Sequence, residues 1–261
     1  MMRENYMKFL CCPSCHGDME LFKKKIIENI IVEGKLFCSK CNKEYRIINS
    51  IPRFVSDKGY AESFGTQWKT FAKSQIDNEK IKESSLRFKS EIGWGEKEIS
   101  NSKILEIGSG AGRFIDVVAS KGASLAIGMD ITDAVDASQE NLSHRENIFF
   151  IQGDIFNPPI KKGSLDLAYS IGVLHHTPAP QTAFNKMVDL VKNKGLIGLS
   201  LYEISLYSRP NKNSLKISTI ELLWSFNLWR VEFFRLITTR IPYKWMIGYC
   251  KTSSSFASLF K

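Results

Sequence analysis

A strand, a glycine-rich turn and a helix follow one another between residues 103 and 121, and this unit constrains the fold of the chain most. Residues 103–107 are typical of a buried parallel strand, and they run into the turn 106–113. Residues 114–121 have the pattern of a helix. Glycines let the backbone turn sharply, and the helix N-terminus behind them favours a carboxylate or phosphate. We therefore expect an α/β domain with a ligand at the carboxyl end of this strand.

The spacing of the glycines narrows the choice of ligand. A dinucleotide-binding turn would have its third glycine at position 113, where this chain has Arg113. The pattern is instead Glu-x-Gly-x-Gly-x-Gly, formed by Glu106, Gly108, Gly110 and Gly112. This form resembles motif I of the class I S-adenosylmethionine-dependent methyltransferases. The resemblance implies that S-adenosylmethionine is the cofactor and that it binds at this turn.

Four more strands are predicted after the turn, at residues 124–129, 148–152, 166–171 and 196–202. Strands that alternate with helices at this spacing predict an α/β fold with a doubly wound, mostly parallel, Rossmann-like sheet of the class I methyltransferase type. The usual sheet of that family has seven strands, of which the last two form an antiparallel edge. Only five can be placed here, and residues 192–195 are predicted to be the turn before the fifth.

Two acidic residues at strand ends are candidates for binding the nucleoside. Asp130 ends the second strand, 22 residues after Gly108, where an acid can accept hydrogen bonds from both ribose hydroxyls. The alternative is a helix N-cap. Asp154 follows the third strand, where an acid in the resembled family contacts the adenine amino group, and the alternative is a turn residue. The predicted cofactor-binding set is Glu106, Gly108, Ser109, Gly110, Gly112, Arg113, Asp130, Ile131, Asp154, Ile155, Ser170 and Gly172.

The segment His175-His176-Thr177-Pro178 resembles the loop after the fourth strand in many small-molecule methyltransferases. The resemblance places it over the cofactor, near the transferred methyl group. His175 and His176 are therefore the candidate catalytic residues, because a histidine can act as a general base near neutral pH. The alternative is that the pair forms the cofactor wall and caps the following helix.

Four of the six cysteines form two Cys-x-x-Cys pairs near the N-terminus. Cys12 and Cys15 make the first pair, Cys38 and Cys41 make the second, and 22 residues separate the pairs. Two such knuckles can complete a tetrahedral four-sulfur site, so this spacing predicts a structural Zn²⁺ ion. The alternative is four unligated thiols. A strand-like run at residues 25–32, followed by Gly34 and residues 36–37, fits the hairpin of a zinc ribbon.

The sequence around the second knuckle resembles two groups of proteins. Residues 37–41 lead into Tyr45-Arg46-Ile47-Ile48 and then residues 49–54. This sequence is similar to that of the small zinc-ribbon proteins that partner tRNA and translation-factor methyltransferases. It is also similar to the ribbon fused to the front of many bacterial methyltransferases. The module is too small to fold on its own core, so the metal is expected to hold it together.

Four segments follow from these patterns. They are a zinc-ribbon-like domain at 1–57, a helical lid or linker at 58–101, the methyltransferase core at 102–202, and a helical, aromatic-rich basic segment at 203–261. In the second segment Phe64, Trp68 and Phe71 share one helical face, which either packs on the core or closes over the site as a lid. In the last, residues 215–237 are mostly apolar, as in a buried helix or one covered by a protein partner or membrane surface.

Charge is spread unevenly along the chain. The net charge of +9 arises from both ends, because residues 102–201 contain nine Lys and Arg against ten Asp and Glu. Residues 202–261 contain nine Lys and Arg against three Asp and Glu. Basic ends fit an anionic partner or merely a soluble basic surface. No run is apolar enough to span a membrane and the N-terminus lacks a secretory signal, so a cytoplasmic protein is expected.

Three functions are compatible with these features. The first is an S-adenosylmethionine-dependent methyltransferase acting on a small metabolite or a glycan or lipid precursor. The second is an rRNA or tRNA methyltransferase that grips phosphates with its ribbon and basic tail. Against it, the base-holding Asn-Pro-Pro-Tyr motif is absent: the nearest string, residues 157–160, follows the third strand rather than the fourth. The third is a non-catalytic scaffold or binding module.

Overall fold

A computed structural model of the chain describes residues 1–55, 76–78 and 82–201, and its first compact unit is Met1–Tyr202. The N-terminal elements are η1 (Glu4–Phe9), β1 (Glu20–Ile27), β2 (Ile30–Phe37), β3 (Glu44–Ile48) and β4 (Ile51–Arg53). The later strands are β5 (Lys103–Ile107), β6 (Leu125–Asp130), β7 (Ile148–Gln152), β8 (Leu165–Ile171) and β9 (Val191–Ser200). The later helices are α2 (Glu83–Glu91), α3 (Glu96–Ile99), α4 (Arg113–Ser120), α5 (Ala134–Asn141), η3 (Leu174–His176) and α6 (Pro180–Leu190).

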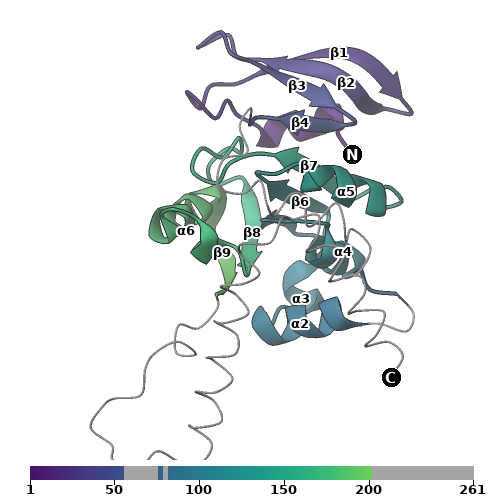
Figure 1. The fold of residues 1–261 in the computed structure, drawn as a ribbon, viewed down its shortest axis with the longest axis vertical. Coiled ribbons are helices and arrows are strands. Elements are labelled where there is room, and N and C mark those ends of the chain that lie inside the picture. The colour runs from purple at the N-terminus through teal and green to yellow at the C-terminus, as the bar shows by residue number, and fades with distance from the viewer. Residues whose placement is uncertain (56–75, 79–81, 202–261) are drawn as a thin grey trace, which may run out of the picture. The chain divides into compact units, whose positions relative to one another are not determined.

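Five parallel strands form the centre of the unit, in the order β7-β6-β5-β8-β9 (Figure 1). The chain runs from β5 outward to β7 and then returns to the other side of β5 as β8. The order therefore reverses beside β5, and ligands of open α/β sheets bind at the carboxyl ends of the strands at such a point. The predicted α/β fold with a doubly wound, mostly parallel sheet is confirmed.

The fifth parallel strand begins earlier than the sequence predicts. Residues 192–195 were expected to form a turn, yet β9 already pairs at Val191 with Leu165. The register then shifts, because Leu167 pairs with Leu196 and only Asp166 opposes the four residues between. Lys194 has a φ of +67°, which allows the extra residues to bulge out of the strand without ending it. The predicted start of this strand was wrong, and its predicted last residue, Tyr202, lies outside the described residues.

The N-terminal strands form an antiparallel meander of three hairpin-connected pairs. The predicted strand-like run 25–32 is interrupted, because Glu28 and Asn29 form the turn between β1 and β2 with φ values of +47° and +65°. Positive φ at both central residues is the geometry of a two-residue hairpin turn, and an Asn at one of them favours it. A hairpin is present as predicted, but its position was wrong: its turn lies inside the predicted run, Gly34 lies within β2, and its first strand begins at Glu20.

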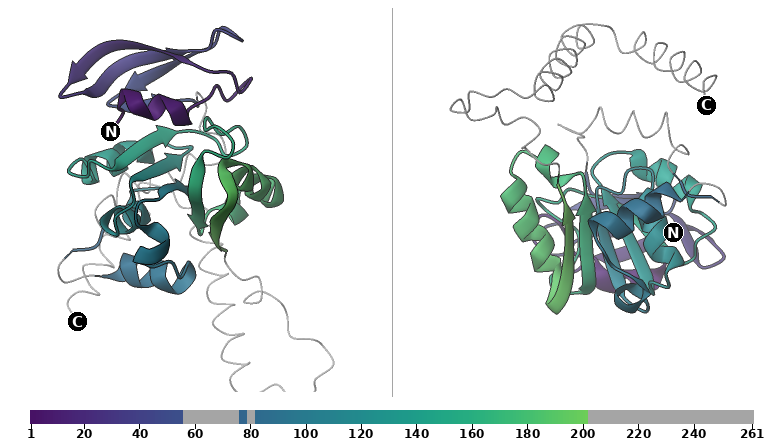
Figure 2. Two further views of the ribbon diagram at one scale, coloured as in Figure 1. Left: turned by 180° about the vertical axis from the view of Figure 1, so that it is seen from behind. Right: turned by 90° about the horizontal axis from the view of Figure 1, so that it is seen from below.

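The zinc-ribbon strands continue directly into the parallel sheet. Arg53 on β4 pairs in parallel with Gln152 on β7, and the Phe54 N–H donates to the Gln152 carbonyl at 2.9 Å. A second connection is the bridge between Leu10 and Ile160. Figure 2 shows η1 between the ribbon strands and the parallel sheet. All nine strands of the described residues therefore belong to one sheet.

Two apolar layers cover the two faces of the sheet. One contains α4 residues together with Phe88 of α2 and Tyr169 of β8. The other joins ribbon residues such as Tyr6 and Leu36 to core residues of α6 and the parallel strands. The rings of Tyr6 and Phe149 lie 5.1 Å apart within that layer. Because one layer contains residues of both parts, the ribbon and the α/β domain share a hydrophobic core.

The division of the chain into four segments stays a prediction. Of segment 58–101, the structure describes α2 and α3, which pack against the later strands and helices through Phe88 and Ile99. The aromatic residues Phe64, Trp68 and Phe71, the apolar run 215–237 and Cys250 lie outside the described residues.

Candidate cofactor site and metal site

The two cysteine knuckles have the same local geometry. The first follows η1 and the second follows β2. In each, the residue after the second cysteine is left-handed: His16 has a φ of +55° and Asn42 a φ of +58°. The His16 N–H donates to the Cys12 carbonyl at 2.8 Å, and the Asn42 N–H donates to the Cys38 carbonyl at 2.8 Å. Each turn therefore closes on itself and directs both of its thiols to one side.

The four thiols converge as a zinc site requires. All four Sγ atoms, from Cys12, Cys15, Cys38 and Cys41, lie within 4.8 Å of one another. Two cross-knuckle distances, Cys12 to Cys41 and Cys15 to Cys38, are 3.5 Å and 3.4 Å. A tetrahedral Zn²⁺ at about 2.3 Å from each sulfur needs sulfur–sulfur distances of about 3.8 Å, so the cluster needs only a small adjustment. These residues fit the predicted structural zinc ion.

Polar contacts favour the thiolate form of Cys12, while its neighbour Cys41 has a raised pKa. Although burial acts in the opposite direction, the Tyr45 hydroxyl and the N–H groups of Ser14 and Cys15 lower the pKa of Cys12 to about 6. The Tyr45 hydroxyl lies 3.4 Å from Cys12 Sγ. Cys11, which was not predicted as a ligand, is buried beside Cys12 but is not part of the cluster of four, and burial raises the pKa of its thiol to about 11.

The glycine turn after β5 contains three left-handed glycines, Gly108, Gly110 and Gly112, and at the first and last of them a side chain would also clash. Gly108 has a φ of +77°, and a Cβ there would lie 2.4 Å from a methyl carbon of Val173. Gly112 has a φ of +92° at the N-cap of α4, and a Cβ there would lie 2.9 Å from Leu142. Any side chain at either position would be strained in φ and would clash with a neighbour. The Glu-x-Gly-x-Gly-x-Gly pattern is thus explained by backbone geometry and close packing.

Asp130 ties the end of β6 to the glycine turn. Its Oδ2 accepts a hydrogen bond from the Gly110 N–H at 2.9 Å. Its Oδ1 accepts from the Thr132 N–H at 2.9 Å and from the Thr132 hydroxyl at 2.7 Å. Each carboxylate oxygen has two lone pairs, so Oδ2 can accept a further hydrogen bond. The carboxylate is buried, which raises its pKa, and the N-cap alternative is not seen, because α5 begins at Ala134 with Asp133 at its N-cap.

Helix α5 holds the same turn from the other side. The Ser138 hydroxyl donates to the Gly110 carbonyl. The Asn141 side-chain amide donates to the Ala111 carbonyl at 3.1 Å. Sequence reasoning did not identify Ser138, Asn141 or Thr132 as supports of the turn. A Thr two residues after the strand-ending Asp is a local signal for such a support, because its short hydroxyl can bond back to the carboxylate.

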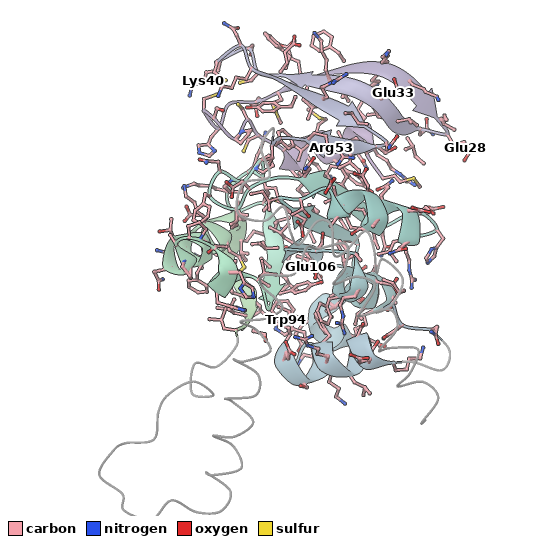
Figure 3. All side chains as sticks on the ribbon, viewed as in Figure 1. Glu28, Glu33, Lys40, Arg53, Trp94 and Glu106 are labelled. Carbon is pink, nitrogen blue, oxygen red and sulfur yellow. The ribbon has the colours of Figure 1, made fainter. Side chains whose placement is uncertain are left out.

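A buried carboxyl lies at the end of β5, beneath the turn. Glu106, which is labelled in Figure 3, stands in register with Tyr169 of β8, as the strand pairing shows. Within the described part of the chain, neither Glu106 Oε2 nor the Tyr169 hydroxyl has a hydrogen-bond partner at normal geometry. Burial raises the pKa of Glu106 well above its usual value; the Tyr169 hydroxyl lowers it in part, and the Asp130 carboxylate raises it further. Phe88 and Trp94 pack edge-on against the Tyr169 ring and help to exclude water.

This burial predicts a pH-dependent stability that Glu106→Gln should remove. A raised folded-state pKa means that the folded state binds the proton more tightly than the unfolded state. The contribution of Glu106 to the free energy of unfolding is then most favourable below its unfolded pKa of about 4.3, and it falls as the pH rises toward the folded pKa. Glutamine is neutral at every pH. We expect its variant to match the wild type near pH 4 and to melt higher at pH 7, by about 3–5 °C per pKa unit of the rise.

Calorimetric melting at several pH values between 4 and 8 checks this expectation. Glu83→Gln is a suitable control, because Glu83 is exposed and starts α2 on the surface. A Glu106→Gln variant that melts below the wild type at pH 7 would contradict the account of Glu106 as a strained buried acid.

Arg113 faces α2 as well as the turn. Its Nε donates to the Ser84 hydroxyl at 3.2 Å, and its guanidinium lies 3.7 Å from the Glu83 carboxylate. It also stacks 4.5 Å from the centre of the Phe114 ring. These contacts join α4 to α2, which is a role that the sequence did not predict. A contact of Arg113 with the cofactor stays a prediction.

The remaining predicted cofactor residues lie at the carboxyl ends of the parallel strands. Asp154 and Ile155 follow β7, and Asp154 Oδ1 accepts from the Phe156 N–H at 3.0 Å in a tight turn. The turn-residue reading of Asp154 is therefore correct for one of its oxygens. Ser109 is buried, and within the described residues its hydroxyl has no hydrogen-bond partner. Ile131 directly follows β6.

Strand β8 ends at the last part of the predicted site. Ser170 is fully buried and its hydroxyl donates to the Ile107 carbonyl at 3.0 Å, which ties β8 to β5. Gly172 has a φ of +70° and starts the segment that leads into η3. His175 and His176 lie on η3, with ring centres 4.0 Å apart. Burial and then the neighbouring His176 lower the pKa of His175, so its imidazole is neutral at neutral pH.

Two regions of the chain match known protein families. Residues 105–199 match the family described as a methyltransferase domain. Residues 5–50 match the family described as Trm112p-like protein. Both matches agree with the resemblances predicted from the sequence, and the structure describes both regions completely.

Relatives of the chain include proteins with different acceptors. A tRNA U34 carboxymethyltransferase of Ruthia magnifica subsp. Calyptogena magnifica is 25% identical over 142 residues, which cover 46% of this chain and 44% of that protein. Phosphoethanolamine N-methyltransferase 1 of Arabidopsis thaliana is 33% identical over 99 residues, which cover 36% of this chain and 20% of that protein. The matches thus span less than half the length of either relative.

A solved structure with a similar fold is that of Haemonchus contortus phosphoethanolamine N-methyltransferase 1 in complex with phosphoethanolamine and S-adenosylhomocysteine. It is 18% identical, with a TM-score of 0.40, and the match covers 60% of this chain and 35% of that one. Among the described residues, no helix is both long enough and apolar enough to cross a membrane.

Proposed function

We propose that this chain, in which an S-adenosylmethionine-dependent methyltransferase domain follows a Trm112p-like zinc ribbon, transfers a methyl group to a small metabolite or to a glycan or lipid precursor. The observation that carries the acceptor class is the histidine segment after β8 in a domain without basic excess. Residues 102–201 contain nine Lys and Arg against ten Asp and Glu, so this domain has no excess of positive charge to attract a phosphate backbone.

The cofactor half of this proposal rests on the carboxyl ends of β5, β6 and β7. The glycine turn and the N-terminus of α4 receive the amino-acid end of the cofactor. Asp130 accepts hydrogen bonds from the ribose, and the second oxygen of Asp154 accepts one from the adenine amino group. When bound, S-adenosylmethionine supplies a methyl group already activated by its sulfonium charge. The chain's main contribution to rate is then the positioning of two reactants.

The histidine pair has one of two roles in this scheme. His175 is neutral and half-buried, so it can take a proton from an acceptor hydroxyl or amine. Alternatively, the pair forms part of the wall around the methyl group, as its packing on η3 also allows. We favour the wall. A pH profile of turnover that loses its acidic limb in His175→Ala, with cofactor affinity unchanged, would instead assign the base.

A second candidate function is methylation of tRNA or rRNA. It is favoured by the tRNA carboxymethyltransferase among the relatives and by the Trm112p-like region. Its phosphate contacts would come from the ribbon and from the basic segment after residue 202. A third candidate, a non-catalytic binding module, keeps the fold without the transfer.

Binding of S-adenosylmethionine to the zinc-loaded full chain tests the proposal first. Titration calorimetry should give one site per chain, and absence of binding would overturn both enzyme readings. Transfer of labelled methyl groups is then measured with pooled small metabolites and, separately, with total tRNA and rRNA. Label in the metabolite fraction supports the proposal. Label in RNA, together with RNA affinity that falls steeply with salt, replaces it with the second candidate.

A further inference from the structure

The last residue of the fourth ribbon strand makes contacts that a mere connecting strand does not need. Arg53 ends β4, the ribbon strand that pairs with the parallel sheet. Its guanidinium reaches past its strand partner to α5. Both terminal nitrogens donate to the Asp136 carboxylate, and one of them, NH1, also donates to Gln152 Oε1 at 3.2 Å. The Arg53 side chain, labelled in Figure 3, is only 13% exposed, so its end of these bonds is largely shielded from solvent.

Gln152 connects Arg53 to the loop after β6 by hydrogen bonds. Its Oε1 accepts from Arg53, which leaves its side-chain N–H group to donate to the Ile131 carbonyl at 3.2 Å. Ile131 directly follows Asp130, and Gln152 is the last residue of β7, two residues before Asp154. One amide side chain thus links the segments that carry both proposed nucleoside contacts.

Asp136 provides the second path. It lies in the first turn of α5, whose N-terminus closes the loop after β6. The same helix supplies Ser138, which holds the Gly110 carbonyl of the glycine turn. A bidentate arginine–carboxylate pair fixes direction as well as distance. Arg53 therefore sets the position of α5 while it orients Gln152.

We propose that Arg53 is a positioning residue for the adenosine half of the cofactor site. It connects the zinc ribbon to the loops after β6 and β7 and holds them at the spacing that the nucleoside requires. The proposal rests on the proposed cofactor site, because it concerns how that site is held. Lysine could not replace Arg53 fully, since one ammonium cannot offer a bidentate pair to Asp136 and also reach Gln152.

The chain contains a matched control for this contact. Lys161 also joins the core to the ribbon, through an ion pair with Asp18 at 2.5 Å. That pair is exposed and touches neither the loop after β6 nor α5. Loss of a ribbon-to-core ion pair as such is therefore tested by Lys161→Met, and loss of the link to the nucleoside loops is tested by Arg53→Met.

The experiment measures dissociation constants on the zinc-loaded full chain by calorimetry at 25 °C. The probes are S-adenosylhomocysteine and 5′-methylthioadenosine, which share the adenosine but differ at the amino-acid end. Arg53→Met should weaken both by about tenfold, or about 1.4 kcal/mol. Arg53→Lys should recover part of the loss, and Lys161→Met should bind both probes as the wild type does. Zinc content and melting temperature are recorded for each variant.

Gln152→Met keeps the measurement decisive if Arg53→Met does not fold, because it breaks the link to Ile131 and leaves the Arg53–Asp136 pair. It should also weaken both probes. Affinities within twofold of the wild type in the folded Arg53 or Gln152 variant would overturn the inference and leave the proposed function standing. Equal losses in Lys161→Met would overturn it too, since the effect would then follow from stability alone. A wild type that binds neither probe would instead refute the proposed cofactor site itself.

Discussion

Replacement of Asp130 with alanine is expected to weaken binding of S-adenosylmethionine by at least about 100-fold. The change removes the proposed charged acceptor of the ribose hydroxyls, and hydrogen bonds to a charged group contribute about 1.5–3 kcal/mol each. It also releases the Gly110 N–H, which the Asp130 carboxylate holds at 2.9 Å, so the glycine turn loses a support at the same time. Titration calorimetry with S-adenosylmethionine or S-adenosylhomocysteine measures the effect.

Asp166→Ala is the matched control for Asp130. Asp166 is also a carboxylate with several partners, since it accepts from the Lys103 N–H at 2.8 Å and from Lys192 Nζ at 2.6 Å. It lies near the amino end of β8, whereas the glycine turn follows the carboxyl end of the neighbouring strand β5. Its loss should lower stability but leave cofactor affinity unchanged. If Asp130→Ala binds the cofactor as tightly as the wild type, the ribose contact has been assigned to the wrong residue.

Removal of the zinc ion is expected to unfold more than the ribbon. Structural zinc in small domains contributes about 10–16 kcal/mol of apparent binding free energy, comparable with the whole stability of a typical protein. Ribbon residues such as Tyr6 and Leu36 share an apolar layer with the parallel strands. Cys38→Ser, or chelation of the metal, should therefore lower the melting temperature of the α/β domain as well. A loss of about 5 kcal/mol corresponds to about 10–20 °C.

Calorimetry and metal analysis test this together. The wild type should contain one zinc ion per chain and melt without a separate early transition of the ribbon. Cys11→Ala is the control, because Cys11 is buried next to Cys12 and its thiol is not part of the cluster of four. It should keep one zinc ion. Metal-free purified wild type, or a Cys38→Ser variant with an unchanged melting profile, would show that the four thiols do not hold a structural metal.

The sequence was most informative where one residue type is required by local geometry. Gly108 and Gly112 could be found because left-handed backbone and close neighbours leave no room for a side chain. The cysteine pairs could be found because two tight turns must direct four thiols to one point. The buried strands β5 and β7 were placed to the residue, since continuous apolar runs between polar turns have clear limits.

Features that depend on contacts between distant segments could not be read from the chain. Nothing in the sequence around Arg53 indicates that β4 would pair with β7, almost one hundred residues later. Nor does it indicate that the Arg53 side chain would reach Asp136. Tyr169 lies within the predicted strand 166–171, and only the register of β5 and β8 places it opposite Glu106. The early start of β9 was missed because a bulge lets a predicted turn remain within a strand.

The pairing of β4 with β7 also changes which backbone is open to other molecules. Without the ribbon, β7 would be an edge strand and would lose its strand pair at Gln152, and an open edge is a template for edge-to-edge aggregation. With the ribbon in place, the sheet ends on that side at β1. This strand has two register shifts and carries Lys23, Lys24 and Lys25 in succession. Irregular pairing and lysines are the means by which natural sheets discourage further strands, so the ribbon gives the domain a protected border.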